Sequence, residues 1–359
     1  MNALYIVYLD KFTKVFADFL MNELTDIEKK IVIYGKKEEF KFTTDDKNIV
    51  FLSDYREYSR SSIIYKWAVE SDVVIFSGVF GTEKLFFKFP SSVKRKSYFH
   101  LWGGDFYDLR EKVPFFSLRK NISKLIKKYS IKRAAGIINL ISGDYWELNK
   151  IVKINSKHFV APVCGRNLDE GLYTKLFNTS KSQNPISICL GNSATKTNNH
   201  IQALNYLKAY KDENIEIVCP LSYGDNKYAK DVIVYGKQVF GDRFIPLTEY
   251  MDKDKYYNFI SKCKIAVFNN DRQQALGNIN MFLSVGTKIY MRNNTSMWET
   301  YINERKYIIY DIEDILNTKF NQFTEFEKKD ALFNFDKAKY YRSIEYKRKQ
   351  WMDFFSQIV

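Results

Sequence analysis

Short apolar runs and amphipathic segments alternate along most of the chain. In the first half, the apolar runs that predict strands lie at residues 3–9, 30–35, 48–52, 72–78, 97–103 and 134–141. Apolar residues recur at helical spacing over residues 11–23, 60–70, 114–130 and 143–150. Strands that alternate with helices are typical of βαβ units, in which helices cover both faces of a parallel sheet.

A more polar segment, residues 164–185, interrupts this alternation, which then begins again. Strands are predicted at residues 186–191, 215–221, 243–247, 264–269, 287–291 and 306–310. Helices are predicted at residues 199–209, 226–238, 253–262, 272–285 and 296–304, and an amphipathic helix without a following strand at 336–359.

The 359 residues are too many for one ordinary domain, so we expect two. Residues 1–163 would form an N-terminal Rossmann-like domain, and 164–335 a C-terminal Rossmann-like domain. The helix over 336–359 would pack back towards the first. Ligands of such an α/β protein bind in a cleft at the carboxyl ends of the strands. GT-B glycosyltransferases, some epimerases and periplasmic binding proteins share this plan, so function must come from the sites.

Composition narrows the cellular setting. No run of about 18 apolar residues predicts a membrane-spanning helix. The N-terminus lacks the basic and small-residue features of a signal peptide. The four cysteines (Cys164, Cys189, Cys219 and Cys263) have no paired spacing. They predict buried thiols in a reducing cytoplasm rather than disulfides or a zinc site.

The chain is basic, with a net charge of +14. Such a protein meets an acidic partner, for example nucleic acid, anionic lipid or a phosphorylated substrate, unless its surface is simply lysine-rich. Residues 115–133 contain seven basic residues and no acidic one. They predict a basic amphipathic helix on an anionic membrane surface, or alternatively a core-packed helix with a basic outer face. The membrane-facing lysines would be Lys120, Lys124, Lys127 and Lys128.

The stretch "ICLGNSATKTNNHIQALNYL", residues 188–207, predicts a strand, a glycine turn and a helix. A helix N-terminus offers unpaired N–H groups and a positive dipole end, and Gly191 lets the backbone come close to an anion. Such a turn can hold a diphosphate without a lysine motif. The alternative is an ordinary turn with Asn198 as the helix N-cap.

A second stretch, residues 268–290, follows another buried strand. It places Asp271, Arg272, Gln273 and Gln274 in the expected first turn of a helix. Arg272 can make a bidentate contact with a phosphate, and the two glutamines can bind sugar hydroxyls. The alternative is a solvated helix start.

A third stretch, "YFHLWGGDFYDL" at residues 98–109, predicts a strand that ends near Asp105. A carboxylate at this edge can act as the general base toward an acceptor hydroxyl. His100 shares a face with Trp102 by strand alternation, and a histidine in a strand is more often structural than catalytic.

Five stretches together resemble glycosyltransferase family 56. They are "FHLWGGDFYDL" from residue 99, "LGNSATKTNNHI" from 190, "PLSYG" from 220, "LTEYMDKDKYY" from 247 and "RQQALGNINMFLSVGTKIYM" from 272. This is the family of TDP-4-acetamido-4,6-dideoxygalactose (TDP-Fuc4NAc):lipid II transferases. The resemblance extends from about residue 70 to the end, whereas the first 70 residues and the Lys/Asn-rich composition depart from better-known members.

The resemblance implies a GT-B fold, two doubly wound Rossmann-like domains that face a cleft, with a C-terminal helix. It implies transfer of a Fuc4NAc-like sugar from a dTDP-sugar to a polyprenyl-diphosphate-linked saccharide. The reaction would belong to enterobacterial common antigen or O-antigen synthesis. The protein would be peripheral, on the cytoplasmic face of the bacterial inner membrane.

The implied site residues divide between the two halves. Asp105 would be catalytic, with His100, Trp102 and Gly104 on the acceptor side. The nucleotide sugar would be held by Gly191, Asn192, Ser193, Ser222, Tyr223, Glu249, Tyr250, Arg272, Gln273 and Gln274. We expect no metal or other cofactor, because helix N-termini and an arginine can neutralise the leaving diphosphate.

Two alternatives belong to other classes of ligand. One is a GT-B transferase that uses another nucleotide sugar, with UDP or GDP. The other is a basic Rossmann-type nucleic-acid-binding protein. The latter would place basic residues and interleaved aromatics along one groove, whereas here they concentrate in one helix and at the C-terminus. We therefore expect no nucleic-acid partner.

Overall fold

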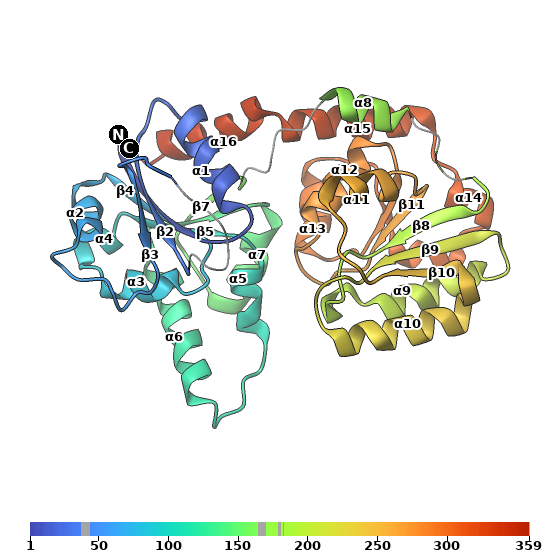
Figure 1. The fold of residues 1–359 in the computed structure, drawn as a ribbon, viewed down its shortest axis with the longest axis horizontal. Coiled ribbons are helices and arrows are strands. Elements are labelled where there is room, and N and C mark those ends of the chain that lie inside the picture. The colour runs from blue at the N-terminus through green and yellow to red at the C-terminus, as the bar shows by residue number, and fades with distance from the viewer. Residues whose placement is uncertain (37–43, 164–169, 179–180, 182, 359) are drawn as a thin grey trace. The chain divides into compact units, whose positions relative to one another are not determined.

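The computed structural model describes residues 1–36, 44–163, 170–178, 181 and 183–358 (Figure 1). The chain divides into two compact units. Unit 1 comprises Met1–Asn167 together with Ile344–Val359, and unit 2 comprises Leu168–Ser343.

Unit 1 is built on a parallel sheet of seven strands, in the order β3-β2-β1-β4-β5-β6-β7. The strands are β1 (Asn2–Tyr8), β2 (Glu28–Tyr34), β3 (Ile49–Leu52), β4 (Val73–Ser77), β5 (Ser97–Leu101), β6 (Gly136–Asn139) and β7 (Lys157–Val160). In β1, Leu4 and Ile6 pack into the core on one face of the sheet, while Tyr5 and Val7 pack on the other. Burial of both faces explains why the central strands are continuously apolar rather than alternating.

Helices cover both faces of this sheet. They are α1 (Thr13–Glu23), α2 (Ile63–Glu70), α3 (Thr82–Lys88), α4 (Ser91–Lys94), α5 (Gly104–Tyr107), α6 (Leu118–Arg133), α7 (Gly143–Val152) and α16 (Ile344–Ser356). The last helix returns to unit 1, where Trp351, Phe354 and Phe355 are buried in the same core cluster as Tyr5. α6 projects away from the sheet (Figure 1).

Unit 2 repeats the plan with six parallel strands, in the order β10-β9-β8-β11-β12-β13. The strands are β8 (Ile186–Leu190), β9 (Ile215–Pro220), β10 (Phe244–Leu247), β11 (Ile265–Phe268), β12 (Lys288–Met291) and β13 (Tyr310–Asp311). Its α-helices are α8 (Glu170–Phe177), α9 (His200–Leu207), α10 (Asn226–Phe240), α11 (Lys253–Ile260), α12 (Leu276–Ser284), α13 (Ser296–Trp298), α14 (Phe320–Thr324) and α15 (Lys328–Arg342).

The predicted helices differ from the observed ones in three places that bear on function. The helix expected over 114–130 begins only at Leu118. The helix expected over 272–285 begins at Leu276, because Ala275 has a left-handed backbone with φ 60° that a right-handed helix does not contain. The single helix expected over 336–359 is two helices, since Ser343 is extended (φ −63°, ψ 155°) and interrupts it.

Two strands also depart from the sequence prediction. β7 was not predicted, because its four residues are only partly apolar and partly buried. The strand predicted over 306–310 is reduced to the two residues of β13.

Among the described residues, no helix is both long and apolar enough to cross a membrane.

Candidate functional site

The carboxyl ends of β8 and β11 lie side by side in unit 2. The two strands pair in parallel, and the chain order of the sheet reverses between them. In open α/β sheets, ligands bind outside the carboxyl ends of strands at such a point. The residues that follow these strands are the first two polar stretches singled out in the sequence.

Gln274 connects the loops that follow three strands. Its Nε2 donates to Asn192 Oδ1 at 3.0 Å, and its Oε1 accepts from Thr197 Oγ1 at 2.6 Å. Asn192 Nδ2 in turn donates to the Tyr223 hydroxyl at 3.1 Å. Three residues predicted for the nucleotide, Asn192, Tyr223 and Gln274, therefore form one hydrogen-bonded network.

A buried asparagine, Asn198, connects this network to neighbouring residues. Asn198 Oδ1 accepts from the Asn192 amide at 3.1 Å and from Asn270 Nδ2 at 3.0 Å. Its own Nδ2 lies 3.4 Å from Ser193 Oγ. Asn198 was considered only as an N-cap and Asn270 was not singled out at all. Asn270 stands two residues after the apolar run of β11, a position that could have drawn attention to it, whereas Asn198 lies within a polar stretch eight residues after β8 and carries no such signal.

Gly191 is required by internal packing. Its φ is +70°, and a Cβ there would lie 2.5 Å from His200 Nε2 and 2.9 Å from Asn198 Oδ1. His200 is fully buried, and burial lowers its pKa to about 4, so the imidazole is neutral near pH 7. The glycine thus lets the turn close onto two buried polar side chains.

The other residues predicted to bind the nucleotide sugar differ in burial. Arg272 is half-buried, and its Nη1 donates to the Gln273 carbonyl at 3.1 Å. The Gln273 side chain is buried, whereas Ser222 is half-buried. Glu249 and Tyr250 are exposed and follow β10, the edge strand, which is two strands away from β8.

In unit 1, Asp105 turns inward. It is fully buried; Oδ2 accepts from the Val79 amide at 2.9 Å, and the Trp102 amide lies 3.0 Å from both carboxylate oxygens. Burial raises the pKa of this carboxyl, while the amide donors oppose the increase. This geometry anchors the loops after β4 and β5 to each other. The role of Asp105 as a general base stays a prediction.

His100 is likewise buried. Its Nδ1 lies 2.8 Å from Ser77 Oγ, and its Nε2 lies 3.0 Å from the Ala161 carbonyl oxygen. Burial lowers the pKa of His100 to about 3. Trp102 is half-buried and Gly104 is exposed at the same edge of the sheet.

The four lysines predicted to face a membrane do not share one environment. Lys127 is buried: its Nζ donates to the Asp105 carbonyl at 2.7 Å and to Asp108 Oδ2 at 2.9 Å. Lys124 Nζ donates to the carbonyls of Asp108 and Glu111. Only Lys120 is exposed, and Lys128 is half-exposed. The assignment of Lys127 to the membrane-facing set was therefore wrong, because this lysine holds α6 onto the protein.

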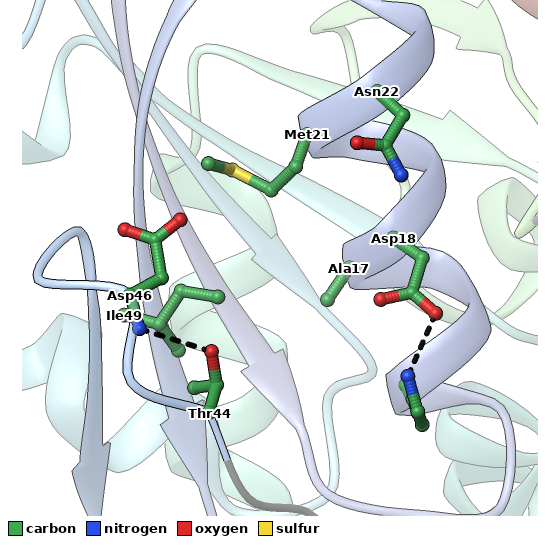
Figure 2. Close-up of a pocket in the computed structure, with 8 residues that line it drawn as sticks. Ala17, Asp18, Met21, Asn22, Thr44, Asp46 and Ile49 are labelled. Atoms are coloured by element: carbon green, nitrogen blue, oxygen red, sulfur yellow. Dashed lines mark hydrogen bonds and ion pairs between the residues drawn. The ribbon is translucent and has the colours of Figure 1, made fainter.

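A cavity of about 170 Å³ lies elsewhere in unit 1 (Figure 2). It is lined by α1, including Asp18 and Met21, and by the segment before and at the start of β3, including Thr44 and Ile49. It borders the amino end of β3, away from the carboxyl ends where the predicted site residues lie. We do not assign it to the site.

Family membership follows from a match along nearly the whole chain. Residues 10–358 match the family described as 4-alpha-L-fucosyltransferase, glycosyl transferase group 56. The chain belongs to glycosyltransferase family 56. It is thus a glycosyltransferase, as the five sequence stretches had indicated.

Solved structures similar to this family 56 chain share its fold. An E. coli trehalose-6-phosphate protein bound with UDP-2-fluoro glucose matches 100% of both chains, with 8% identity and a TM-score of 0.66. A glycosyltransferase from Rickettsia africae matches 99% of this chain and 98% of its own, with 13% identity and a TM-score of 0.65. WaaG, a glycosyltransferase involved in lipopolysaccharide biosynthesis, matches 100% of both chains, with 10% identity and a TM-score of 0.59. The predicted GT-B fold is confirmed.

The described part of this family 56 chain contains no group of three or more His, Cys, Asp or Glu side chains that could hold a metal ion. Cys189, Cys219 and Cys263 are free and buried. Cys164 lies outside the described residues.

Proposed function

We propose that this enzyme transfers a deoxyamino sugar, similar to Fuc4NAc, from a dTDP-sugar to a polyprenyl-diphosphate-linked saccharide. The product would serve the synthesis of a bacterial surface polysaccharide, such as enterobacterial common antigen or O-antigen. Membership of family 56 supports the reaction class. The observation that carries the proposal is the polar network at the carboxyl ends of β8 and β11, which unites residues quoted for the family resemblance.

The network suits the diphosphate end of a nucleotide sugar. When the sugar departs, negative charge develops on the diphosphate, and fixed donors around it stabilise that charge. The side-chain amides of Asn192 and Gln274 each have a second N–H to offer, and the Thr197 hydroxyl holds the Gln274 amide in place by donating to its Oε1. The half-buried Arg272, on the same loop as Gln274, would supply the positive charge.

We place the acceptor on unit 1 and the enzyme on the cytoplasmic face of the inner membrane, as a peripheral protein. Support comes from the exposed apolar side chains before and along α6. Phe115 is 97% exposed and Phe116 is 87% exposed, and Leu118 and Leu125 are also largely exposed. Such large apolar groups on a projecting helix are costly in water and suit insertion into a bilayer (Figure 1).

Charge complementarity supports an anionic bilayer as the partner. Lys120 is exposed beside these apolar residues, and Lys128 is half-exposed one turn beyond Leu125. A basic residue near an anionic membrane contributes about 1 kcal/mol. The other end of the helix packs on the core, where Ile131 belongs to a buried cluster of unit 1, so a membrane would meet the exposed Phe115 and Phe116 before its amino end.

A GT-B transferase with another nucleotide is the competing proposal. It is favoured by the similar E. coli protein that was solved with UDP-2-fluoro glucose. Thermal stability measured with dTDP, UDP, GDP and CMP separates the two, because a ligand at 100 times its Kd stabilises by about 2.7 kcal/mol. We expect dTDP to raise the melting temperature most. A larger increase with UDP or GDP would contradict the assignment of the donor.

A further inference from the structure

The carboxyl edge of unit 1 has its own point of reversal, between β1 and β4. The strand order runs β3-β2-β1 on one side of this point and β4-β5-β6-β7 on the other. β1 and β4 pair in parallel, with Val7 opposite Ser77. The residues that follow, from Tyr8 and from Gly78 onward, therefore emerge next to each other where a ligand of this sheet would bind.

Three aromatic rings meet at this edge. The centroids of the Tyr8 and Phe80 rings are 4.9 Å apart, and those of Phe80 and Trp102 are 6.4 Å apart. Phe80 is 40% exposed, and the other two residues are half-buried. A Cβ on the exposed Gly104 would meet only Phe80 within 4 Å, at 3.9 Å, so the adjoining space is open.

Buried hydrogen bonds fix the indole of Trp102. Its Nε1 donates to Ser77 Oγ at 3.1 Å, and Ser77 Oγ lies 2.8 Å from His100 Nδ1. A carbonyl oxygen only accepts, so His100 Nε2 must donate to Ala161 O at 3.0 Å. Nδ1 of the neutral ring then accepts from the Ser77 hydroxyl, and that hydroxyl accepts from the indole. Ser77 and His100 are fully buried, so the indole is held in one orientation.

A carboxylate follows one of the rings in the chain, in the loop after β1. Asp10 comes two residues after Tyr8, is partly exposed, and accepts a hydrogen bond from the Phe12 amide at 2.6 Å through Oδ1. Burial raises the pKa of Asp10 above its ordinary value. In contrast to Asp105, this side chain is not enclosed by the protein.

We infer that the edge formed by Tyr8, Asp10, Phe80 and Trp102 is a saccharide subsite for one sugar ring of the acceptor. The rings of Phe80 and Trp102 pack against the C–H face of the sugar, and the Asp10 carboxylate accepts a hydrogen bond from one of its hydroxyls. His100 acts through Ser77 and Trp102, and is a positioning residue. This inference rests on the proposed function, since it assumes that unit 1 takes the acceptor.

Fluorine NMR of protein labelled with 5-fluorotryptophan tests the subsite directly. The chain has five tryptophans, and the variant Trp102→Phe assigns the signal of Trp102. The probes are a panel of free amino-sugar and uronic-acid disaccharides, and farnesyl phosphate as a soluble prenyl probe. We expect a disaccharide to shift the Trp102 signal, and farnesyl phosphate to leave it unchanged.

Matched variants check that the rings make the contact. Phe80→Ala should raise the half-saturating disaccharide concentration roughly 2- to 12-fold, the range for an aromatic contact. Phe87→Ala is the control, because Phe87 is also half-exposed in unit 1 but packs against Tyr129 of α6. It should leave disaccharide binding unchanged.

The role of His100 has its own readout. His100→Leu should move or broaden the Trp102 signal without any ligand, and His100→Gln should restore it, because an amide can both donate and accept. An unchanged Trp102 signal in His100→Leu would show that His100 does not orient the indole.

A dTDP titration of the same labelled protein distinguishes failure of the saccharide subsite from failure of the proposed function. If dTDP binds but no disaccharide of the panel moves the Trp102 signal, or if only farnesyl phosphate moves it, the saccharide subsite is wrong and the donor assignment stands. If dTDP does not bind either, the proposed function itself fails.

Discussion

The two sheets have closely related topologies but carry opposite kinds of side chain at their carboxyl edges. In unit 2, amides and hydroxyls from three loops bind one another around Gln274, with Arg272 on the same loop. In unit 1, aromatic rings dominate, and the Asp105 carboxylate is buried and accepts a hydrogen bond from a backbone amide.

Under the proposed function, this difference lets one scaffold serve two ligands. Preformed donors suit a charged diphosphate, which loses hydration on binding and needs fixed partners. Aromatic rings suit an uncharged sugar face, and the exposed phenylalanines before α6 suit lipid. Variants in each unit test whether these side chains bind the ligand assigned to that unit.

The largest effect is expected at the end of unit 1 that we propose faces the membrane. Phe115→Asp combined with Phe116→Asp should weaken binding to anionic vesicles roughly 30- to 1,000-fold, since two partly inserted rings are worth about 2–4 kcal/mol. Co-sedimentation with vesicles measures this. The binding of dTDP, which we assign to unit 2, should not change.

A charge variant is a second test of this helix. Lys120→Glu should weaken vesicle binding in a salt-dependent way, because Lys120 is exposed. Vesicle binding that survives the double phenylalanine variant would show that α6 does not insert.

The second-largest effect is expected when the Arg272 side chain is removed from unit 2. Arg272→Ala should weaken dTDP binding by about 1.5–3 kcal/mol, the range for a hydrogen bond to a charged group. Calorimetry measures this, with Lys237→Ala as a control, because Lys237 lies near the far end of α10 and pairs with Asp242. Equal dTDP affinity in Arg272→Ala and the parent would remove this arginine from the site.

The third prediction uses a variant of Asp105 to distinguish a structural role of this carboxylate from a catalytic one. In Asp105→Asn one carboxylate oxygen becomes an NH₂ group, which cannot accept from the amides of Val79 or Trp102. We expect the free energy of unfolding to fall by about 1–3 kcal/mol, the cost of a buried unsatisfied donor.

Denaturant unfolding and turnover are measured on the same Asp105→Asn sample. Unchanged stability together with a roughly 100-fold loss of kcat would instead support the role as general base.

The effect that is smallest near neutral pH, and that grows towards pH 4, is the titration of His158. Burial lowers the pKa of His158 to about 4, so the folded protein keeps this ring neutral where the unfolded chain takes up a proton, below about pH 6.5. Stability should therefore fall as the pH decreases from about 6.5 to 4.

In His158→Asn that slope should be shallower by up to about 1.4 kcal/mol per pH unit, the value for one proton. Denaturant unfolding at a series of pH values measures it. An identical slope in both proteins would show that the ring titrates normally.

Much of the scaffold was predictable because the central strands are continuous apolar runs. β1 is one such run, and the loops after β8 and β11 carried polar residues that proved to lie together. The short β7 lacked a comparable signal.

The sequence did not predict whether several side chains of the candidate site face solvent or the protein interior. Asp105 follows two glycines, and the same residues are compatible with a carboxylate that faces solvent or one that binds amides. Lys127 has the helical spacing of an outward lysine, yet it meets Asp105 O and Asp108. The left-handed Ala275 that delays α12 is not marked by a glycine. Each outcome depends on tertiary contacts rather than on local pattern.

Hydrogen exchange with and without saturating dTDP tests the assignment of the nucleotide to unit 2 most directly. We expect slower exchange in the loops at residues 191–198 and 269–275, where the network would be covered and rigidified. The unit 1 segments at residues 9–13, 78–81 and 102–105 should keep their exchange rates. Protection confined to the unit 1 segments would contradict the account, because it would place the nucleotide at the aromatic edge instead.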